Sequence, residues 1–320
     1  MGLLLPAVAV VLGLVGLVFG ADRFVYGASN LARRMGVSPL IVGMLIVGLG
    51  TSAPEMLVSA TAALDGSGGI ALGNAVGSNI TNIALVLGTT ALIKPISLHG
   101  EIVKREFPVL LAITGITALL LLDYALTPLD GGILIVVLIL FLVRTIRSGR
   151  AATEDEDSDK TPVVGYGRAA LWLFIGLSLL IASSRGVVWG AETIATALGV
   201  SDLIIGLTVV AIGTSLPELA ASAASAFRGE HAMAIGNVIG SNVFNLLAVM
   251  PFPALLDGGE IEPALLERDY VVMAGLTVLL TIFAIGFRKQ GRINRVEGGI
   301  LLLCYIGYVT LLVLSALEQV

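Results

Sequence analysis

The chain has 320 residues, of which 57% are hydrophobic and only 13% charged, with a mean hydropathy of +1.00 and a net charge of −5. Soluble domains carry about a quarter charged residues, so this composition excludes a soluble globular protein and predicts one that crosses the bilayer several times. Long unbroken apolar runs favour helices over a β-barrel, whose strands alternate in polarity. The chain shows no basic patch for nucleic acid, no phosphate loop and no nucleophile–base arrangement, so we expect neither a nucleic-acid partner nor an enzyme.

Ten apolar stretches approach the length of about 20 residues that a helix needs to cross a membrane. In chain order they lie at 3–22, 39–64, 70–92, 107–122, 131–145, 168–186, 203–227, 233–256, 270–287 and 297–316. We therefore predict an all-α polytopic membrane protein with ten transmembrane helices, although the fifth stretch is short. The first stretch has no charged segment before it and no cleavage site, so we interpret it as a span rather than a removable signal.

The chain contains an internal duplication. Residues 26–86 align without a gap onto residues 189–249, and the identical positions are mostly Gly, Ser, Thr, Asn, Pro and Glu. Each copy would hold five spans, an odd number, so the second copy enters the membrane in the opposite sense. We predict a first inverted repeat over 1–145, a cytoplasmic linker over 146–166 with an acidic run at 153–159, and a second inverted repeat over 167–320.

Positive charge predicts the orientation of these spans. All of the 18 Lys and Arg residues except Arg23, Arg185 and Arg268 fall in the loops after odd-numbered spans or at their margins. Cytoplasmic loops carry such an excess. We expect both termini to lie outside the cytoplasm, with the chain in the cell (inner or plasma) membrane.

The same signature occurs in both copies, as Gly50-Thr51-Ser52-Ala53-Pro54-Glu55 and, 163 residues later, as Gly213-Thr214-Ser215-Leu216-Pro217-Glu218. Proline lacks an N–H and crowds the carbonyl four residues back, so each helix should kink or break there. A charge at the bilayer centre costs about 2.5–3.5 kcal/mol even on insertion scales. Carboxylates beside hydroxyls and freed carbonyls offer the oxygen ligands that hard cations prefer.

A structural alternative exists for the signature, since Ser52 and Glu55 also fit a helix capping box. Two copies at the same depth favour a cation site instead. The following spans carry polar residues at every fourth position along one helical stripe, namely Asn74, Ser78, Asn82 and Asn237, Ser241, Asn245. For Asn74 and Asn237 we favour hydrogen bonds between helices, and for the other four we favour ligation. Asn79 and Asn242 lie off the stripe.

Two Gly-Thr-Ser-x-Pro-Glu motifs, each followed by Gly-Asn-x-x-Gly-Ser-Asn, resemble the repeats of the calcium/cation antiporter superfamily, most of all those of prokaryotic sodium/calcium exchangers. The resemblance implies two inverted halves, four central ion sites, and first and sixth spans that slide past the rest. It implies a calcium site built from Glu55 and Glu218 with the carbonyls of Thr51 and Thr214. The implied flanking sodium ligands are Ser52, Ser78, Ser215 and Ser241 with the carbonyls of Gly48 and Ala211, and Asn82 and Asn245 line the middle.

One departure concerns Asn245, where members often carry aspartate, which leaves the ion stoichiometry and any potassium dependence open. The predicted function is a secondary active antiporter that exchanges Na⁺ for Ca²⁺ by alternating access. It would work as a monomer in the lipid bilayer without a cofactor. A proton-driven antiporter for Ca²⁺ or another divalent cation is the alternative, and a passive cation channel is a further one. Proton-driven members usually replace the Thr-Ser pair, so its presence favours sodium.

Overall fold

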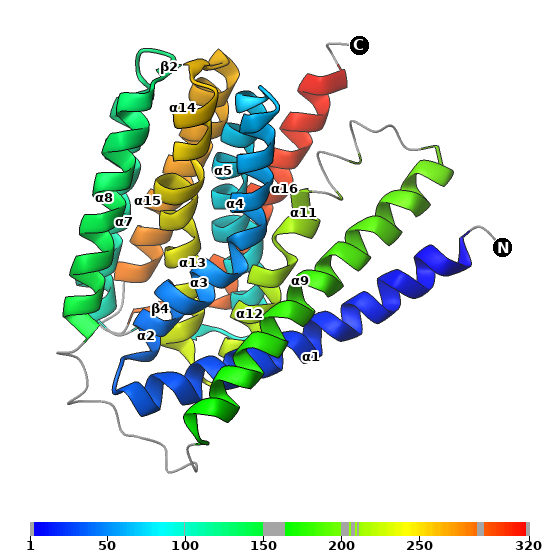
Figure 1. Ribbon diagram of the computed structural model, residues 1–320, viewed down its shortest axis with the longest axis vertical. Coiled ribbons are helices and arrows are strands. Elements are labelled where there is room, and N and C mark those ends of the chain that lie inside the picture. The colour runs from blue at the N-terminus through cyan, green and yellow to red at the C-terminus, as the bar shows by residue number, and fades with distance from the viewer. Residues whose placement is uncertain are drawn as a thin grey trace.

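The computed structural model describes residues 3–98, 100–149, 164–199, 211–286 and 291–317, together with Ile205 and Val209. Within these ranges seven helices are long and apolar enough to cross a membrane, or eight if one bent pair counts as a span. Helices make up nearly all of the described chain, and the only strands in it are four two-residue segments (Figure 1). The helical class predicted from the apolar runs is confirmed.

The part of the chain before the linker folds into helices joined by short turns. Its elements are α1 (Leu4–Met35), α2 (Pro39–Val42), η1 (Gly43–Val47), α3 (Gly48–Thr51), α4 (Ala53–Leu64), α5 (Gly68–Thr81), η2 (Asn82–Leu87), α6 (Gly88–Ile93), β1 (Ile96–Ser97), α7 (Gly100–Leu121), β2 (Ala125–Leu126) and α8 (Pro128–Gly149). The segments labelled η are π-helical.

The part after the linker repeats much of this pattern. Its elements are α9 (Tyr166–Ala197), α11 (Ala211–Thr214), α12 (Leu216–Phe227), α13 (His231–Phe244), η4 (Asn245–Val249), α14 (Pro251–Leu256), β3 (Gly259–Glu260), η5 (Leu265–Tyr270), α15 (Val271–Ile285), β4 (Arg292–Ile293) and α16 (Arg295–Leu317). The predicted span 203–227 lies partly outside the described residues, so the count of ten spans and their inverted arrangement stay predictions.

The helices α1 and α9 are each 32 residues long, well beyond the predicted 3–22 and 168–186. At 1.5 Å per residue each extends about 48 Å, more than the roughly 30 Å of hydrocarbon in a bilayer. They pack along each other and run obliquely beside the remaining helices (Figure 1). Hydropathy ended the first prediction at Asp22, but the helix continues past this charge to its C-cap at Gly36.

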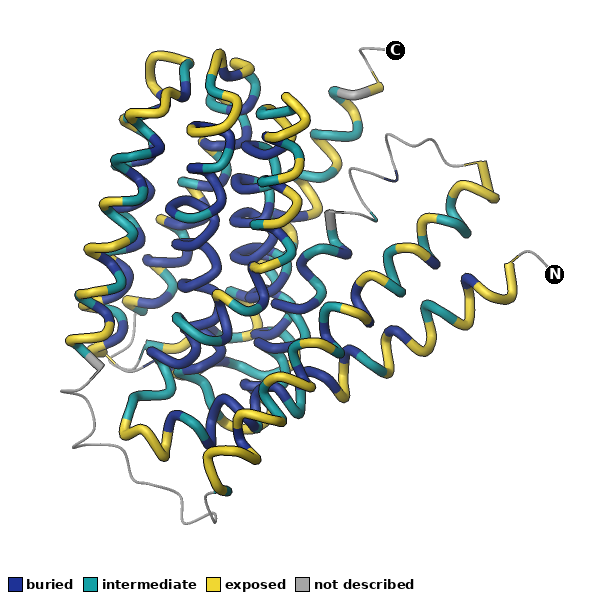
Figure 2. The backbone as a smooth tube through the Cα atoms, viewed as in Figure 1, coloured by how far each residue is buried: buried dark blue, intermediate teal, exposed yellow. Residues whose placement is uncertain are grey.

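Burial is concentrated in the helices that carry the polar stripes. In Figure 2 the buried colour fills the centre of the bundle, while α1, α8 and α9 alternate between buried and exposed positions. Within the apolar windows, 72% of the α5–α6 stretch and 83% of the α13–α14 stretch are buried, against 28% for α1 and 22% for α9. The stripe helices therefore form the interior, and α1 and α9 lie at its edge.

Basic residues gather at one end of the bundle. Lys94 Nζ donates to the carbonyl of Phe227 at 3.0 Å, and Arg295 donates to the carbonyl of Ile93 at 3.4 Å. The pairing of Ile96 with Ile293 joins β1 to β4 near this end. The other small sheet, β2 with β3, joins the opposite end (Figure 1). The loops predicted to share the cytoplasmic side thus contact one another.

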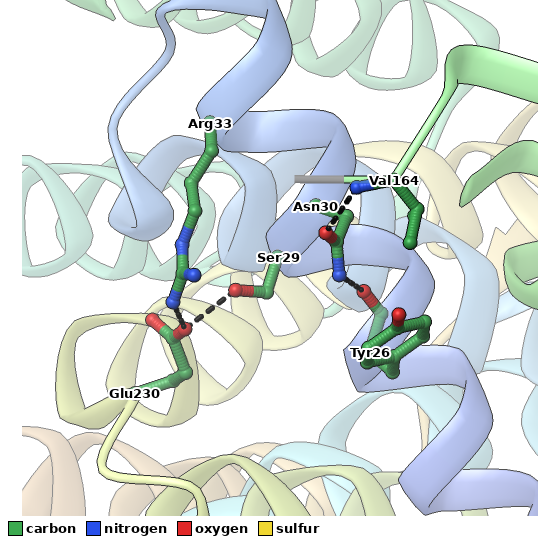
Figure 3. Close-up of polar contacts among 6 residues, drawn as sticks. All are labelled: Tyr26, Ser29, Asn30, Arg33, Val164 and Glu230. Atoms are coloured by element: carbon green, nitrogen blue, oxygen red, sulfur yellow. Dashed lines mark hydrogen bonds and ion pairs between the residues drawn. The ribbon is translucent and has the colours of Figure 1, made fainter. Parts of the chain in front are cut away.

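One polar cluster attaches α1 to the loop between α12 and α13. Glu230 accepts hydrogen bonds from Ser29 at 2.5 Å and from Arg33 at 3.0 Å (Figure 3). Arg228 on the same loop pairs with Asp22 at 2.5 Å. We call these five residues the α1 contact cluster, and they join one of the two long edge helices to the interior.

Candidate cation site

A break interrupts each helix at the repeated signature. α3 ends at Thr51, Ser52 has φ −82° and ψ 1°, and α4 begins at Ala53. The helical stretch Pro39–Thr51 is bent by 44° from α4 at this point. In the second copy α11 ends at Thr214 and α12 begins at Leu216, with Ser215 at φ −91° and ψ 5°. The prolines lie in the first turn of α4 and α12, where a missing N–H is tolerated. The break predicted from proline chemistry is confirmed.

The capping-box alternative is not realised in the structure. Neither Ser52 nor Ser215 makes a side-chain cap hydrogen bond. Glu55 and Glu218 are both 1% exposed, and none of their four carboxylate oxygens has a hydrogen-bond partner among the described residues. Ser52 and Ser215 therefore do not cap α4 and α12.

A set of buried oxygens that have no hydrogen-bond partner in the described part of the chain surrounds the two breaks. Besides the carboxylates, it includes the side-chain oxygens of Ser52, Ser215, Asn82 and Asn245. The charges of Glu55 and Glu218 lie close enough to interact. A buried, unpaired carboxylate costs several kcal/mol, and buried polar groups are almost always hydrogen-bonded. So many unpaired oxygens at one place point to a ligand that supplies positive charge.

The two halves interlock around these oxygens. α5 passes into the π-helical η2 at Asn82, and α13 passes into η4 at Asn245. α4, which carries Glu55, packs against η4, and α12, which carries Glu218, packs against η2. Each carboxylate helix thus contacts the asparagine segment of the other half. Single π-helical turns within α-helices occur frequently at functional sites.

Two asparagines hold the backbone at the carboxylates. Asn74 donates to the carbonyl of Glu55 at 3.1 Å and to Ser59 at 3.0 Å. In the second copy Asn237 donates to the carbonyl of Glu218 at 3.2 Å, and it also donates to Ser222 at 2.8 Å. These contacts agree with the interhelical role favoured for both asparagines. The two serines were not among the predicted site residues, although they also match at the 163-residue spacing.

A close helix crossing brings Gly48 to Ser241. The Gly48 carbonyl accepts from Ser241 Oγ at 3.4 Å and from Thr51 Oγ1 at 3.4 Å. Thr51 Oγ1 also lies 3.2 Å from Asn237 Oδ1. A Cβ on Gly48 would lie 3.0 Å from the Ser241 nitrogen, closer than an ordinary contact, so glycine favours this close crossing. Three sequence-predicted site residues therefore meet here.

The counterparts of Gly48 and Thr51 in the second copy lie on α11. Thr214 is half-buried at the end of α11, Ala211 begins this helix, and α11 contacts α5, which carries the buried Ser78. The carbonyl of Gly213 accepts a hydrogen bond from Ser184 on α9 at 2.7 Å, a contact that no sequence signal had indicated. The side chain of Ala211 lies outside the described part.

The donor set suits a hard cation. The unpartnered oxygens of this set come from carboxylates, hydroxyls and amides, the oxygen ligands that Ca²⁺ and Na⁺ prefer. Among the described residues no three His, Cys, Asp or Glu side chains gather at one point. The cluster therefore combines a formal charge of −2 with neutral oxygens, which differs from the nitrogen and sulfur sites typical of zinc.

Comparisons with known proteins agree with this chemistry. A family model described as "Sodium/calcium exchanger protein" matches residues 5–147 and 168–314. The chain is 48% identical over 316 residues to CaxA of Alkalimonas amylolytica, covering 97% of this chain and 99% of that protein. It is 38% identical over 288 residues to the inner membrane protein YrbG of Escherichia coli, covering 88% and 89%. The solved structure of the sodium-calcium exchanger NCX_Mj matches with a TM-score of 0.84 at 34% identity, covering 96% of this chain and 98% of that chain.

Proposed function

The chain belongs to the sodium/calcium exchanger protein family, and on this premise we propose that it is a secondary active antiporter that exchanges Na⁺ for Ca²⁺ by alternating access. Membership confirms the resemblance that the paired motifs indicated, and it makes the chain a cation antiporter of the membrane. The choice of sodium as the driving ion and the roles of individual residues are parts of the proposal.

One observation carries the proposal: two buried carboxylates, one from each copy of the signature, have no hydrogen-bond partner within the described residues on any of their four oxygens. Their combined charge of −2 matches one Ca²⁺ ion. The same oxygens can instead help to bind Na⁺ ions, but both sets of ions cannot occupy them together. Without an ion, two uncompensated charges in a dry passage would oppose movement of the protein between its two orientations. Exchange rather than leak follows from this cost.

The ligand roles follow the motifs. Glu55 and Glu218, with the carbonyls of Thr51 and Thr214, would bind Ca²⁺. The proposed Na⁺ ligands are Ser52, Ser78, Ser215 and Ser241 with the carbonyls of Gly48 and Ala211, and Asn82 and Asn245 line the middle. The unpartnered hydroxyls of Ser52 and Ser215 support sodium over protons, because protons would need only the carboxylates. The name of NCX_Mj as a sodium-calcium exchanger supports the same choice.

We further propose ten spans in two inverted repeats, over 1–145 and 167–320, with a linker at 146–166. The hydrogen bonds that Arg33, Lys94, Arg228 and Arg295 donate to other residues at one end of the bundle support a common cytoplasmic side, with both termini outside. The relative YrbG, named an inner membrane protein, supports the cell membrane. One chain supplies both carboxylates, so a monomer would suffice, with α1 and α9 moving against the interior.

Uptake of radioactive Ca²⁺ into proteoliposomes tests the exchange. Vesicles loaded with Na⁺ and diluted into Na⁺-free medium should take up Ca²⁺, and Glu55→Gln and Glu218→Gln should each lower the rate at least a hundredfold. A hundredfold loss corresponds to about 2.7 kcal/mol. This is a modest part of the electrostatic attraction that a divalent ion loses when one of its two carboxylates becomes a neutral amide. Glu101→Gln, on an exposed carboxylate paired within its own helix, is the matched control and should keep the wild-type rate.

The same vesicles separate the alternatives. Uptake driven by a pH gradient, with no Na⁺ gradient present, would show that protons and not Na⁺ drive the exchange. Uptake driven by the Ca²⁺ gradient alone would indicate a channel. Undiminished Ca²⁺ flux in the double variant Glu55→Gln/Glu218→Gln would refute the proposed cation site itself.

A further inference from the structure

We propose that Asn79 is a positioning residue that fixes the amide of Asn245 with its oxygen available to a cation. The inference rests on the proposed function, because it assigns a role toward the ion of the same site. Asn79 ends the Gly-Asn-x-x-Gly-Ser-Asn motif of the first copy, but it lies off the polar stripe of α5 and none of the ligand roles above includes it. Its side chain is 2% exposed, in the interior between the two halves.

A backbone carbonyl can only accept a hydrogen bond, so its partner must be a donor. The side-chain nitrogen of Asn79 donates to the carbonyl of Asn242 at 3.2 Å. The same nitrogen lies 3.5 Å from the sulfur of Met273, a weak acceptor. The carbonyl of Asn242 and the sulfur of Met273 are both acceptors, so the end of the Asn79 amide that faces them must be the nitrogen.

This choice determines the orientation of the next amide. With its nitrogen facing Asn242, Asn79 presents its oxygen to Asn245, and Asn245 Nδ2 donates to it at 3.0 Å. The opposite end of the Asn245 amide is then oxygen, and this oxygen is buried and accepts no hydrogen bond from any residue that the structure describes. The backbone carbonyl of Asn242 thus orients the amide of Asn79, and Asn79 in turn orients the amide of Asn245. As a result Asn245 presents its oxygen, and not its N–H groups, to the cation site.

We call the two successive hydrogen bonds, from Asn79 to the carbonyl of Asn242 and from Asn245 to Asn79, the amide relay. This relay matters because residue 245 is an asparagine, whose side chain ends in one oxygen and one nitrogen. Both ends of an aspartate side chain are oxygens, so no partner is needed to select one. An asparagine that turned over would place N–H donors where a cation binds, and it would repel the ion. Asn79 is therefore the residue that makes an asparagine at 245 compatible with a cation site.

The first copy lacks the equivalent bond. By the repeat, Asn242 corresponds to Asn79 and Asn82 corresponds to Asn245. Both side-chain atoms of Asn242 and of Asn82 are buried without a hydrogen-bond partner among the described residues. The relay thus operates on one asparagine of the pair, which sequence identity between the copies does not reveal.

Transport kinetics of a double-mutant cycle test the relay. Asn79→Leu, close in size but without donors or acceptors, should raise the KM for Ca²⁺ about tenfold, the effect of roughly 1.4 kcal/mol in binding, with a smaller change in the maximal rate. In an Asn245→Ala background there is no amide to orient, so adding Asn79→Leu should change KM less than twofold. A tenfold rise in both backgrounds would show that Asn79 acts through packing alone and would overturn the proposal.

A second measurement needs neither transport nor a variant of Asn79. In protein labelled with ¹⁵N at asparagine, the side-chain amide of Asn245, assigned by its loss in Asn245→Ala, should exchange its hydrogen-bonded proton slowly. Exchange as fast as that of an exposed asparagine would overturn the relay. If wild-type vesicles show no Na⁺-driven uptake, the exchange proposal fails, and this measurement still decides the relay.

Discussion

Gly240 and Gly77 occupy the same position in the two copies, 163 residues apart, but the structure places them in different surroundings. A Cβ added to Gly240 would lie 2.3 Å from the carbonyl oxygen of Met44 and 2.7 Å from its Cα. At Gly77 no atom of the described residues lies within 4 Å of such a Cβ. We therefore predict opposite outcomes for Gly240→Ala and Gly77→Ala.

The magnitudes follow from two opposing effects. Alanine favours a helix over glycine by up to about 1 kcal/mol, so Gly77→Ala should be neutral or slightly stabilising. At Gly240 the atoms that clash belong to the backbone and cannot rotate away, so α13 must move from Met44 by roughly 1 Å. Overpacking of this kind costs about 1–3 kcal/mol, which outweighs the gain in propensity. The shift would also separate the neighbouring Ser241 from the carbonyl of Gly48, now 3.4 Å away.

Thermal unfolding in one detergent and Na⁺-driven Ca²⁺ uptake measure the two effects. Gly240→Ala should melt several degrees below the wild type and lose at least nine-tenths of its uptake. Gly77→Ala should melt at or above the wild-type temperature and keep its uptake. Equal losses in the two variants, or none in Gly240→Ala, would refute the argument from helix proximity.

Two further substitutions probe the break and the edge helix. Ser52→Ala should leave the unfolding free energy within about 0.5 kcal/mol of wild type, since Ser52 makes no cap bond. It should raise the Na⁺ concentration that gives half-maximal uptake, because a proposed Na⁺ ligand is removed. A loss of stability near about 1 kcal/mol would instead indicate that Ser52 caps the helix. Glu230→Gln should weaken the α1 contact cluster by up to about 1 kcal/mol, because Arg33 is a third exposed and the pair is partly screened. Distances between spin labels on α1 and on the α12–α13 loop should then show up to about a fivefold larger population in which α1 is separated from the loop. An unchanged distance distribution would contradict the role of the α1 contact cluster in joining the two.

Much of the site could be predicted from the chain, because its chemistry is local. Pro54 and Pro217 lack an N–H wherever they lie, so the breaks at Ser52 and Ser215 follow from covalent structure. The cost of a buried carboxylate singled out Glu55 and Glu218 in the same way. Helix ends were predicted less well, since a charge such as Asp22 ends an apolar run without ending a helix.

The duplication, the broken helices and the oxygen-bearing residues were determined by the sequence itself. The difference between equivalent positions was decided only by the tertiary structure. Gly240 contacts the backbone of Met44 and Asn79 orients Asn245, whereas no such contact is found for Gly77 and Asn242 within the described residues. The reason is physical: two copies of one motif have the same local preferences, and only the packing of the two halves in a particular arrangement gives equivalent residues different neighbours.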